Sequence, residues 1–191
     1  MGPMDMKSAL AGFCTGVAVV TALDPEDGRP VGMAVQSFSS VSLDPPLVCF
    51  CPAHTSTTWP RIRVAGRFAV NVLAADQEEL CRRFAVTGGD KFAGTAWRPG
   101  DAGGAPLLDG ALATVECTLD AVLDGGDHAI ALGRVDALTA HRDTGPLLYF
   151  RRAYGRLPSA ESAESAAARA RSFSSSSMSA SMASARSRSE A

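Results

Sequence analysis

The chain has 191 residues, 46% of them hydrophobic and 20% charged, and a formal net charge of −2 at pH 7. This length is enough for one domain with a sizeable core and leaves little room for a second. The slightly acidic balance argues against nucleic acid or an anionic membrane as the main partner, and no apolar run approaches the ~20 residues that span a bilayer.

Short strands and helices are predicted in the first half of the chain, with Pro and Gly marking most turns. A β-branched run, GVAVVTAL, indicates the first strand, and the turn DPEDG ends it. One predicted helix has Leu80 and Phe84 four residues apart, with Asp76 placed to be its N-cap. The expected helices cover residues 4–13, 57–64 and 76–85. The expected strands cover residues 16–23, 31–42, 47–50 and 67–73.

The second half is predicted to be almost entirely β. Alternating strands are expected over 114–122 and 129–139, with a last one over 147–151, and glycine pairs at 103–104 and 125–126 predict turns. Six or seven strands with a few short helices predict a mainly β fold, a closed or partly closed antiparallel barrel. The sequence lacks the glycine fingerprints of phosphate loops and of doubly wound dinucleotide folds.

A change in composition after Pro158 predicts the end of the folded domain. Residues 159–191 include 13 Ser and 10 Ala but a single aromatic residue, Phe173. Such a segment buries too little apolar surface to offset the entropy that ordering costs. We therefore expect a folded domain over 1–158 and a disordered, low-complexity tail over 159–191.

Neither the cysteines nor the histidines predict a cross-link or a metal centre. The cysteines are odd in number and irregularly spaced, a poor disulfide framework, and the three histidines show no ligand spacing. We expect buried thiols in a reducing compartment and, because no signal peptide is evident, a cytoplasmic protein. The cysteines expected to be buried are Cys14, Cys49, Cys51, Cys81 and Cys117.

Two segments rich in hydroxyl groups are candidates for binding a polar ring edge or a phosphate. The first is QSFSSVS at 36–42, where alternation along one strand would place Ser37 and Ser39 on the same face. The second is PAHTSTTWP at 52–60, before a predicted helix whose first amide groups would attract anions. Each segment also has a plain structural explanation, as an edge strand running into a turn or as a helix cap.

Three further segments place a charged or titratable side chain beside glycine or aromatic residues. Lys91 in FAVTGGDKFAG could meet a phosphate as a point charge, although a solvated turn lysine is the simpler explanation. His128 opens a strand after a glycine turn, where an imidazole could exchange a proton or make one ordinary hydrogen bond. Residues 146–157 combine three aromatic residues with three arginines.

Taken in this order, the segments resemble the flavin reductase-like family of split-barrel flavin-binding proteins. The family includes the reductase components of two-component flavin-dependent monooxygenases. The resemblance covers 6–157 and implies a Greek-key split barrel, as a homodimer with flavin near the subunit interface. The matching segments are GFCTGVAVVTA at 12–22, GMAVQSFSSVSLDPPLVCF at 32–50, RRFAVTGGDKFAG at 82–94, GDHAIALGRV at 126–135 and PLLYFRRAYGRL at 146–157.

The resemblance implies an oxidoreductase that moves a hydride from NADH or NADPH to FAD or FMN. Reduced flavin would then diffuse to a partner monooxygenase or halogenase, and the Ala- and Arg-rich composition associates the chain with antibiotic or other secondary-metabolite biosynthesis. NADH is favoured because no arginine pair is evidently set aside for a 2′-phosphate. Two alternatives stay open. One is a non-catalytic flavin- or haem-binding barrel. The other is a pyridoxamine-phosphate-oxidase-like enzyme, although the serine-rich pattern SFSSVSLDPP favours the reductase group instead.

The same resemblance assigns site residues, with no metal among their ligands. Residues 34–41 would line the isoalloxazine ring, 51–58 the ribityl chain or phosphate, and the lysine loop the phosphate or adenosine side. His128 would be catalytic, bordering the nicotinamide pocket with Arg151 and Tyr154. The flavin contacts carried over are Ala34, Val35, Gln36, Ser37, Phe38, Ser40, Val41, Cys51, Pro52, Ala53, Ser56, Thr57, Phe84, Lys91 and Phe92.

Overall fold

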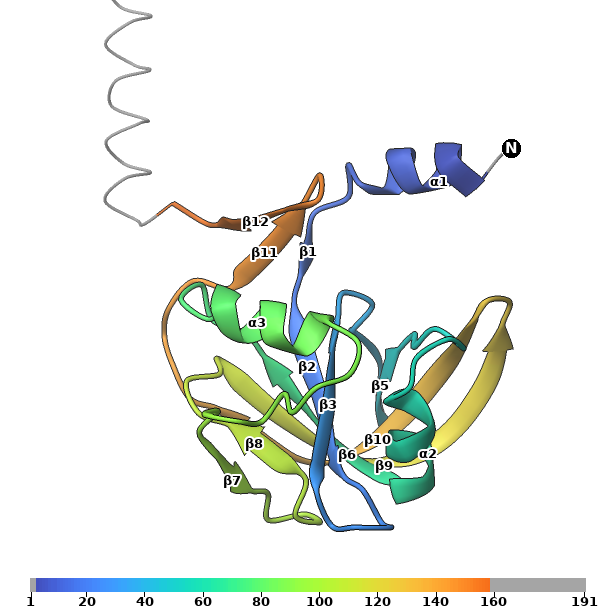
Figure 1. Ribbon diagram of the computed structural model, residues 1–191, viewed down its shortest axis with the longest axis vertical. Helices are drawn as coiled ribbons and strands as arrows, with labels where there is room; N and C mark the ends of the chain where they lie inside the picture. Colours follow the sequence, from blue (N-terminus) through green and yellow to red (C-terminus); the bar gives the residue numbers. More distant parts are fainter. Residues whose placement is uncertain (1–2, 159–191) are drawn as a thin grey trace, which may run out of the picture. The chain divides into compact units, whose positions relative to one another are not determined.

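The computed structural model describes residues 3–158, so the predicted tail over 159–191 lies outside the described residues. Within residues 3–158, no helix is long and apolar enough to cross a membrane. The helices are short, as expected from the sequence, and strands make up most of the regular structure (Figure 1). The helices are α1 (Pro3–Leu10), α2 (Trp59–Ala65) and α3 (Glu78–Ala85). The strands are β1 (Thr15–Gly16), β2 (Ala18–Leu23), β3 (Pro30–Val35), β4 (Ser39–Leu43), β5 (Pro46–Phe50), β6 (Arg67–Val72), β7 (Trp97–Pro99), β8 (Pro106–Leu108), β9 (Ala113–Gly125), β10 (His128–Ala140), β11 (Leu147–Phe150) and β12 (Ala153–Arg156).

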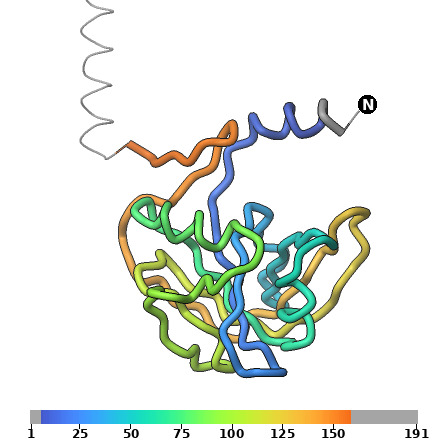
Figure 2. The backbone as a smooth tube through the Cα atoms, viewed as in Figure 1, coloured from blue at the N-terminus to red at the C-terminus, as the bar shows by residue number. Residues whose placement is uncertain are grey.

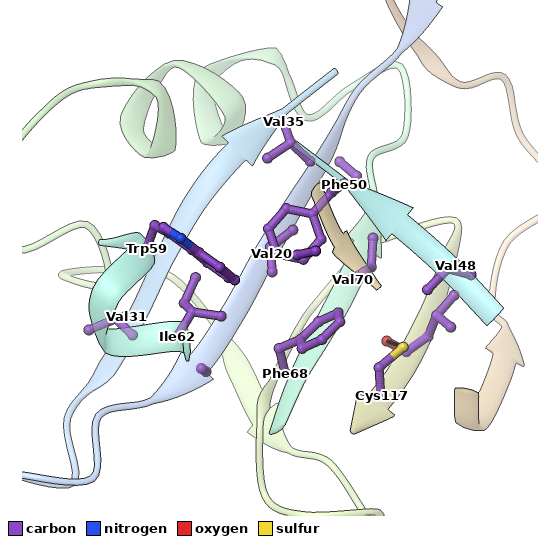
Figure 3. Packing of buried hydrophobic residues seen from close by; sticks show 14 of the residues in the cluster. Val20, Val31, Val35, Val48, Phe50, Trp59, Ile62, Phe68, Val70 and Cys117 are labelled. Carbon is purple, nitrogen blue, oxygen red and sulfur yellow. Dashed lines mark hydrogen bonds between the residues drawn. The ribbon is translucent and has the colours of Figure 1, made fainter. Parts of the chain in front are cut away.

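Seven antiparallel strands form the main sheet, in the order β3-β2-β6-β9-β10-β5-β4. Strand β6 returns to pair with β2 instead of β5, the kind of long-range return found in Greek-key folds. The sheet curls on itself, because Val35 near one edge and Phe50 near the other belong to a single buried cluster (Figure 3). The mainly β barrel predicted from the sequence is therefore confirmed.

Aromatic rings fill the centre of this barrel. Phe50, which is fully buried, meets Trp59 edge-on at 5.7 Å and Phe68 at 5.4 Å between ring centroids. Gly133 of β10 leaves room for Phe68, because a Cβ at this position would lie 2.4 Å from the ring carbon Cζ. Strand β10 thus carries a glycine where a side chain would collide with an aromatic ring of the core.

A second buried cluster lies between the barrel and α3. Helix α3 contributes Cys81 and Phe84 to it, the two buried residues of a helix whose other side is charged. Tyr149 and Tyr154 pack against this cluster from the small sheet β1-β11-β12. Figure 2 shows the β11–β12 hairpin and α1 extending from the same end of the barrel.

The single strand predicted over 31–42 is wrong, because the chain bends at 36–38 and forms two strands, β3 and β4. At the bend, the Ser37 hydroxyl accepts a hydrogen bond from the Cys51 N–H at 2.8 Å. The Ser37 hydroxyl takes the place of a strand carbonyl as the hydrogen-bond acceptor for this N–H group. The chain can therefore change direction after β3, and β4 pairs with β5. Ser37 and Ser39 consequently do not share one strand face.

Two smaller sequence predictions also need correction. The N-cap of α3 is Gln77, not Asp76, whose carboxylate accepts two hydrogen bonds from the Arg142 guanidinium at 2.8 and 3.0 Å. An arginine 66 residues away therefore competes successfully for this side chain. The cysteines are all free, but only Cys81 and Cys117 are buried. Cys14 is exposed because it lies between α1 and β1, outside both apolar clusters, and the other two cysteines are half-buried.

Candidate functional site

Strand β3 is an edge strand of the main sheet, and predicted site residues lie at both of its ends. Its Gly32 carbonyl accepts a hydrogen bond from the Lys91 ammonium group, so the backbone polar groups of Gly32 point away from β2. Because backbone groups alternate along a strand, those of Ala34 point to the same free side. Within the described residues, β3 therefore presents a backbone edge that no other strand covers, between two groups of predicted residues.

The first group, here named the bend group, comprises Ser37, Cys51, Ala53 and His128. Ser37 is tied to Cys51 as described above, and an isolated β-bridge joins Ala53 to His128. Two more backbone hydrogen bonds link the same segments, from the Ala129 N–H to the Pro52 carbonyl at 2.9 Å and from the His54 N–H to the Asp127 carbonyl at 3.0 Å. The β3–β4 bend, the loop after β5 and the β9–β10 turn are thus held together.

His128 is held in one orientation by its neighbour. Its Nδ1 lies 2.7 Å from an Asp127 carboxylate oxygen, and this hydrogen bond with the imidazole lowers the pKa of Asp127. The His128 side chain is 43% exposed, which leaves the ring accessible to a ligand. With Nδ1 engaged, Nε2 is the nitrogen that can meet a bound molecule.

The second group lines a pocket of about 680 Å³ at the start of β3, here named the β3 pocket. Its walls are the β2–β3 turn, the beginning of β3, the residues before and within α2, and the loop after α3. Three of the predicted residues line this pocket: Thr57, Lys91 and Phe92. This volume falls within the range of about 300–1,000 Å³ that is usual for small-molecule sites.

Lys91 is positioned by two backbone carbonyls. Its Nζ donates to the carbonyls of Gly32 at 3.2 Å and Phe84 at 3.4 Å, which leaves one of its three N–H groups for a ligand. Burial lowers the pKa of Lys91. Asp90 orders the loop around it, since one carboxylate oxygen accepts the N–H groups of Phe92 and Ala93. The lysine is therefore held in place, unlike a freely solvated turn residue.

Phe84 and Ser56 contact residues that line the pocket. Phe84 is 1% exposed, and its ring meets that of Phe92 edge-on with centroids 5.1 Å apart. The Ser56 hydroxyl accepts the N–H groups of Thr58 and Trp59 and contacts the Met33 sulfur at 3.9 Å. Ser56 thus orders the start of α2, while its neighbour Thr57 faces the pocket.

Arg151 and Tyr154 belong to the β11–β12 hairpin and join neither group within residues 3–158. The Tyr154 hydroxyl lies 3.3 Å from the Cys81 sulfur, and the Arg82 guanidinium lies 4.7 Å from the centre of its ring. Burial raises the pKa of Tyr154. Arg151 lies in the hairpin turn with a φ of 48°, and its guanidinium is 5.1 Å from the Phe150 ring centre.

The sequence analysis missed the charged residues on the far wall of the β3 pocket. Arg61 of α2 forms an ion pair with Asp24, a carboxylate buried at the end of β2, and lies 3.7 Å from Asp27. The hydrogen bonds from the Glu26 N–H and from Arg61 lower the pKa of Asp24. Arg29 of the β2–β3 turn also lines the pocket. A single sequence gives no signal that joins Asp24 to an arginine 37 positions later.

The chain thus combines an antiparallel barrel with a pocket beside an edge strand, and three cationic and two anionic side chains line this pocket. Residues 10–158 match the family described as flavin reductase like domain, and the chain belongs to this family. The chain is 48% identical over 152 residues to the reductase subunit HsaB of a flavin-dependent monooxygenase from Rhodococcus jostii, covering 80% of this chain and 76% of that protein. It is 47% identical over 150 residues to the FMN reductase (NADH) SmoA of Agrobacterium fabrum, covering 78% and 83%. The crystal structure of the NADH:FAD oxidoreductase SgcE6 of Streptomyces globisporus, in complex with NAD and FAD fragments, matches with a TM-score of 0.77 and 36% identity over 82% of this chain and 93% of that chain.

Proposed function

We propose that this protein is an NADH:flavin oxidoreductase that reduces FAD or FMN and releases the reduced flavin to a partner monooxygenase. The observation that carries the proposal is the position of Lys91, held by two carbonyls in the wall of a pocket beside the start of β3. Membership of the flavin reductase family and the names of the relatives support the reaction. The partner, by the names of these relatives, is a flavin-dependent monooxygenase.

The flavin would lie along β3, with its phosphate in the β3 pocket and its ring at the bend group. Lys91 and Thr57 would hold the phosphate, the ammonium as a charge and the hydroxyl as a hydrogen-bond donor. From Gly32 to Gln36 the strand rises roughly 13 Å at about 3.3 Å per residue, enough to separate a phosphate from a ring. Backbone groups of Ala34 and the bend at 36–38 would meet the polar edge of the ring.

The protein's part in the reaction is to bind and orient two flat molecules. Hydride transfer moves two electrons and one proton together from the nicotinamide to the flavin, and the cofactors supply this chemistry. The side chains of the site would hold the reacting faces of the nicotinamide and the flavin in contact. They would also exclude other molecules from the space between the two rings. His128, oriented by Asp127, would border the nicotinamide through Nε2. This chemistry needs no catalytic triad, because the cofactors supply the hydride and accept it.

We further propose that the active unit is a homodimer and that the β11–β12 hairpin of one subunit completes the site of the other. Within residues 3–158 of one chain, Arg151 and Tyr154 lie on a hairpin that is not part of the bend group of His128. Large apolar side chains are exposed on the segments that a partner could cover, with Leu43 92% and Phe13 72% exposed. A dimer would bury these side chains and bring the hairpin to the bend group.

Purified protein mixed with NADH and free flavin tests the proposed reaction. We expect NADH oxidation, followed by its absorbance, that requires added flavin and scales with protein concentration. In the absence of oxygen, the flavin absorbance should bleach. A protein that binds flavin tightly without oxidising either NADH or NADPH would contradict the proposal and favour a flavin-binding barrel without turnover.

A further inference from the structure

The β3 pocket is larger than the phosphate of FMN needs. Lys91 and Thr57 occupy one part of its wall, and the proposed function uses only these two polar side chains. Asp27, Arg29 and Arg61 form the wall contributed by the β2–β3 turn and α2. A single phosphate group would leave most of the volume of about 680 Å³ empty. The unused part is charged and polar, which points to a second polar moiety.

The two arginines of this wall differ in how firmly they are paired. Arg61 is committed to the buried Asp24, so it fixes the β2–β3 turn against α2 and has little charge left for a ligand. Arg29 is 81% exposed, and its Nε lies 3.9 Å from the Asp27 carboxylate. A pair this open costs little to rearrange, because exposed ion pairs contribute little to stability. Arg29 is therefore the cation of this wall that a ligand can recruit.

The loop after α3 contributes two glycines to the lining of the same pocket. Gly88 and Gly89 have φ values of 77° and 73°, and a Cβ built on either would meet no atom within 4 Å. Side-chain-free residues at the rim let a flat ring approach the chain closely. Together with Arg29, whose planar guanidinium stacks on aromatic rings, they form a slot suited to a purine base.

We propose that this part of the pocket takes the AMP half of FAD, so that the protein selects FAD over FMN and riboflavin. The inference rests on the proposed function, because it extends the flavin from the phosphate at Lys91 into the remaining space. The second phosphate would lie next to the first, Arg29 would contact it or the adenine, and the Asp27 carboxylate would accept hydrogen bonds from the ribose hydroxyls. The relatives named above reduce FMN in one case and FAD in another, so family membership does not decide this choice.

An adenosine phosphate could also come from NADH, whose ADP half has the same chemistry. The FAD source is favoured because the slot is continuous with the phosphate position at Lys91, whereas the nicotinamide is assigned to the bend group at the other end of β3. The two sources predict different kinetics. A contact to FAD changes the KM for FAD alone, while a contact to NADH changes the KM for NADH with every flavin.

The test compares Arg29→Ala with Arg134→Ala in the full-length protein, varying FAD, FMN and riboflavin at saturating NADH, and varying NADH at a saturating concentration of each flavin. Arg134 is a matched control, because it is also exposed and also lies 3.9 Å from a nearby aspartate. We expect the wild type to have a KM for FAD at least tenfold below that for FMN. Arg29→Ala should raise the KM for FAD about tenfold and leave those for FMN and riboflavin unchanged, while Arg134→Ala changes none.

Three results would overturn the inference: equal KM values for FAD and FMN in the wild type, an equal effect of Arg29→Ala on all flavins, or an effect on NADH alone. Quenching of flavin fluorescence, measured without NADH, separates this inference from the proposed function. A protein that binds FAD more tightly than FMN and loses this preference in Arg29→Ala, yet oxidises no NADH, would support the slot and refute the reductase.

Discussion

At the scale of single residues, Lys91 is the side chain on which flavin binding depends most. Lys91→Ala should raise the KM for FMN and FAD by about tenfold to a hundredfold, since hydrogen bonds to charged groups contribute about 1.5–3 kcal/mol. Riboflavin, which has no phosphate, should keep its KM. Lys7 is the only other lysine of the chain and is exposed, so Lys7→Ala is the matched control. A riboflavin KM that rises as much as the FMN KM would place the phosphate elsewhere.

The pH dependence of binding follows from the same residue. Burial lowers the pKa of Lys91, so its ammonium loses a proton at a lower pH than an exposed lysine does. The charged form binds phosphate, and therefore the affinity for FMN should fall as the pH rises through this lowered pKa. Lys91→Arg keeps its charge and should give a flat profile over the same alkaline range. Flavin fluorescence titrations between pH 7 and 10 measure both profiles; identical profiles would exclude Lys91 as the titrating group.

His128 should affect turnover more than flavin binding. His128→Ala removes a side chain assigned to the nicotinamide, so we expect kcat/KM for NADH to fall by up to about tenfold, since one hydrogen bond contributes about 0.5–1.5 kcal/mol. Flavin affinity should stay within a few-fold of the wild type. His141→Ala is the control, because His141 bonds to Thr114 at the far end of β10. Unchanged steady-state kinetics in His128→Ala would reject this role.

Pocket residues could be predicted from the sequence where the surrounding loop itself marks the side chain as functional. Lys91 and Thr57 were singled out from their loops, and the structure brings both to one pocket. Asp24, Arg29 and Arg61 were missed because their role arises from contacts between distant segments, which one sequence does not reveal. The prediction that Asp76 caps α3 was wrong for the same reason, because its carboxylate binds Arg142, which lies 66 residues later in the chain.

At the scale of elements, strand β3 both packs against the core and forms part of the proposed flavin site. A Cβ on Gly32 would lie 2.7 Å from the Phe84 ring, which sits behind the pocket. Gly32→Ala should therefore cost about 1–3 kcal/mol of stability and also displace the wall that holds Lys91. Gly133→Ala is equally crowded, by Phe68 at 2.4 Å, but lies in the barrel centre. Both variants should melt at lower temperature, and only Gly32→Ala should raise the KM for FMN; an equal effect of the two on KM would contradict this.

The elements themselves were largely predictable, because alternation and turn residues act locally. The long hairpin of β9 and β10 was anticipated from its two alternating runs and the glycine pair between them. The very short strands β1, β7, β8 and β12 were missed, since two to four residues carry too little periodic signal. The β3–β4 bend was missed because it depends on a hydrogen bond between Ser37 and Cys51, which lie 14 residues apart.

At the scale of the whole molecule, the family match ends where the composition changes, at residue 158. We therefore propose that the flavin reductase domain ends at residue 158. A chain truncated after Pro158 should keep the melting temperature and the kcat of the full-length protein, because the Ser- and Ala-rich segment offers little apolar surface to bury. Calorimetry and NADH oxidation measure the two quantities, with size-exclusion chromatography to compare the oligomeric state. A fall of several degrees in melting temperature would show that residues 159–191 contribute to the stability of the domain.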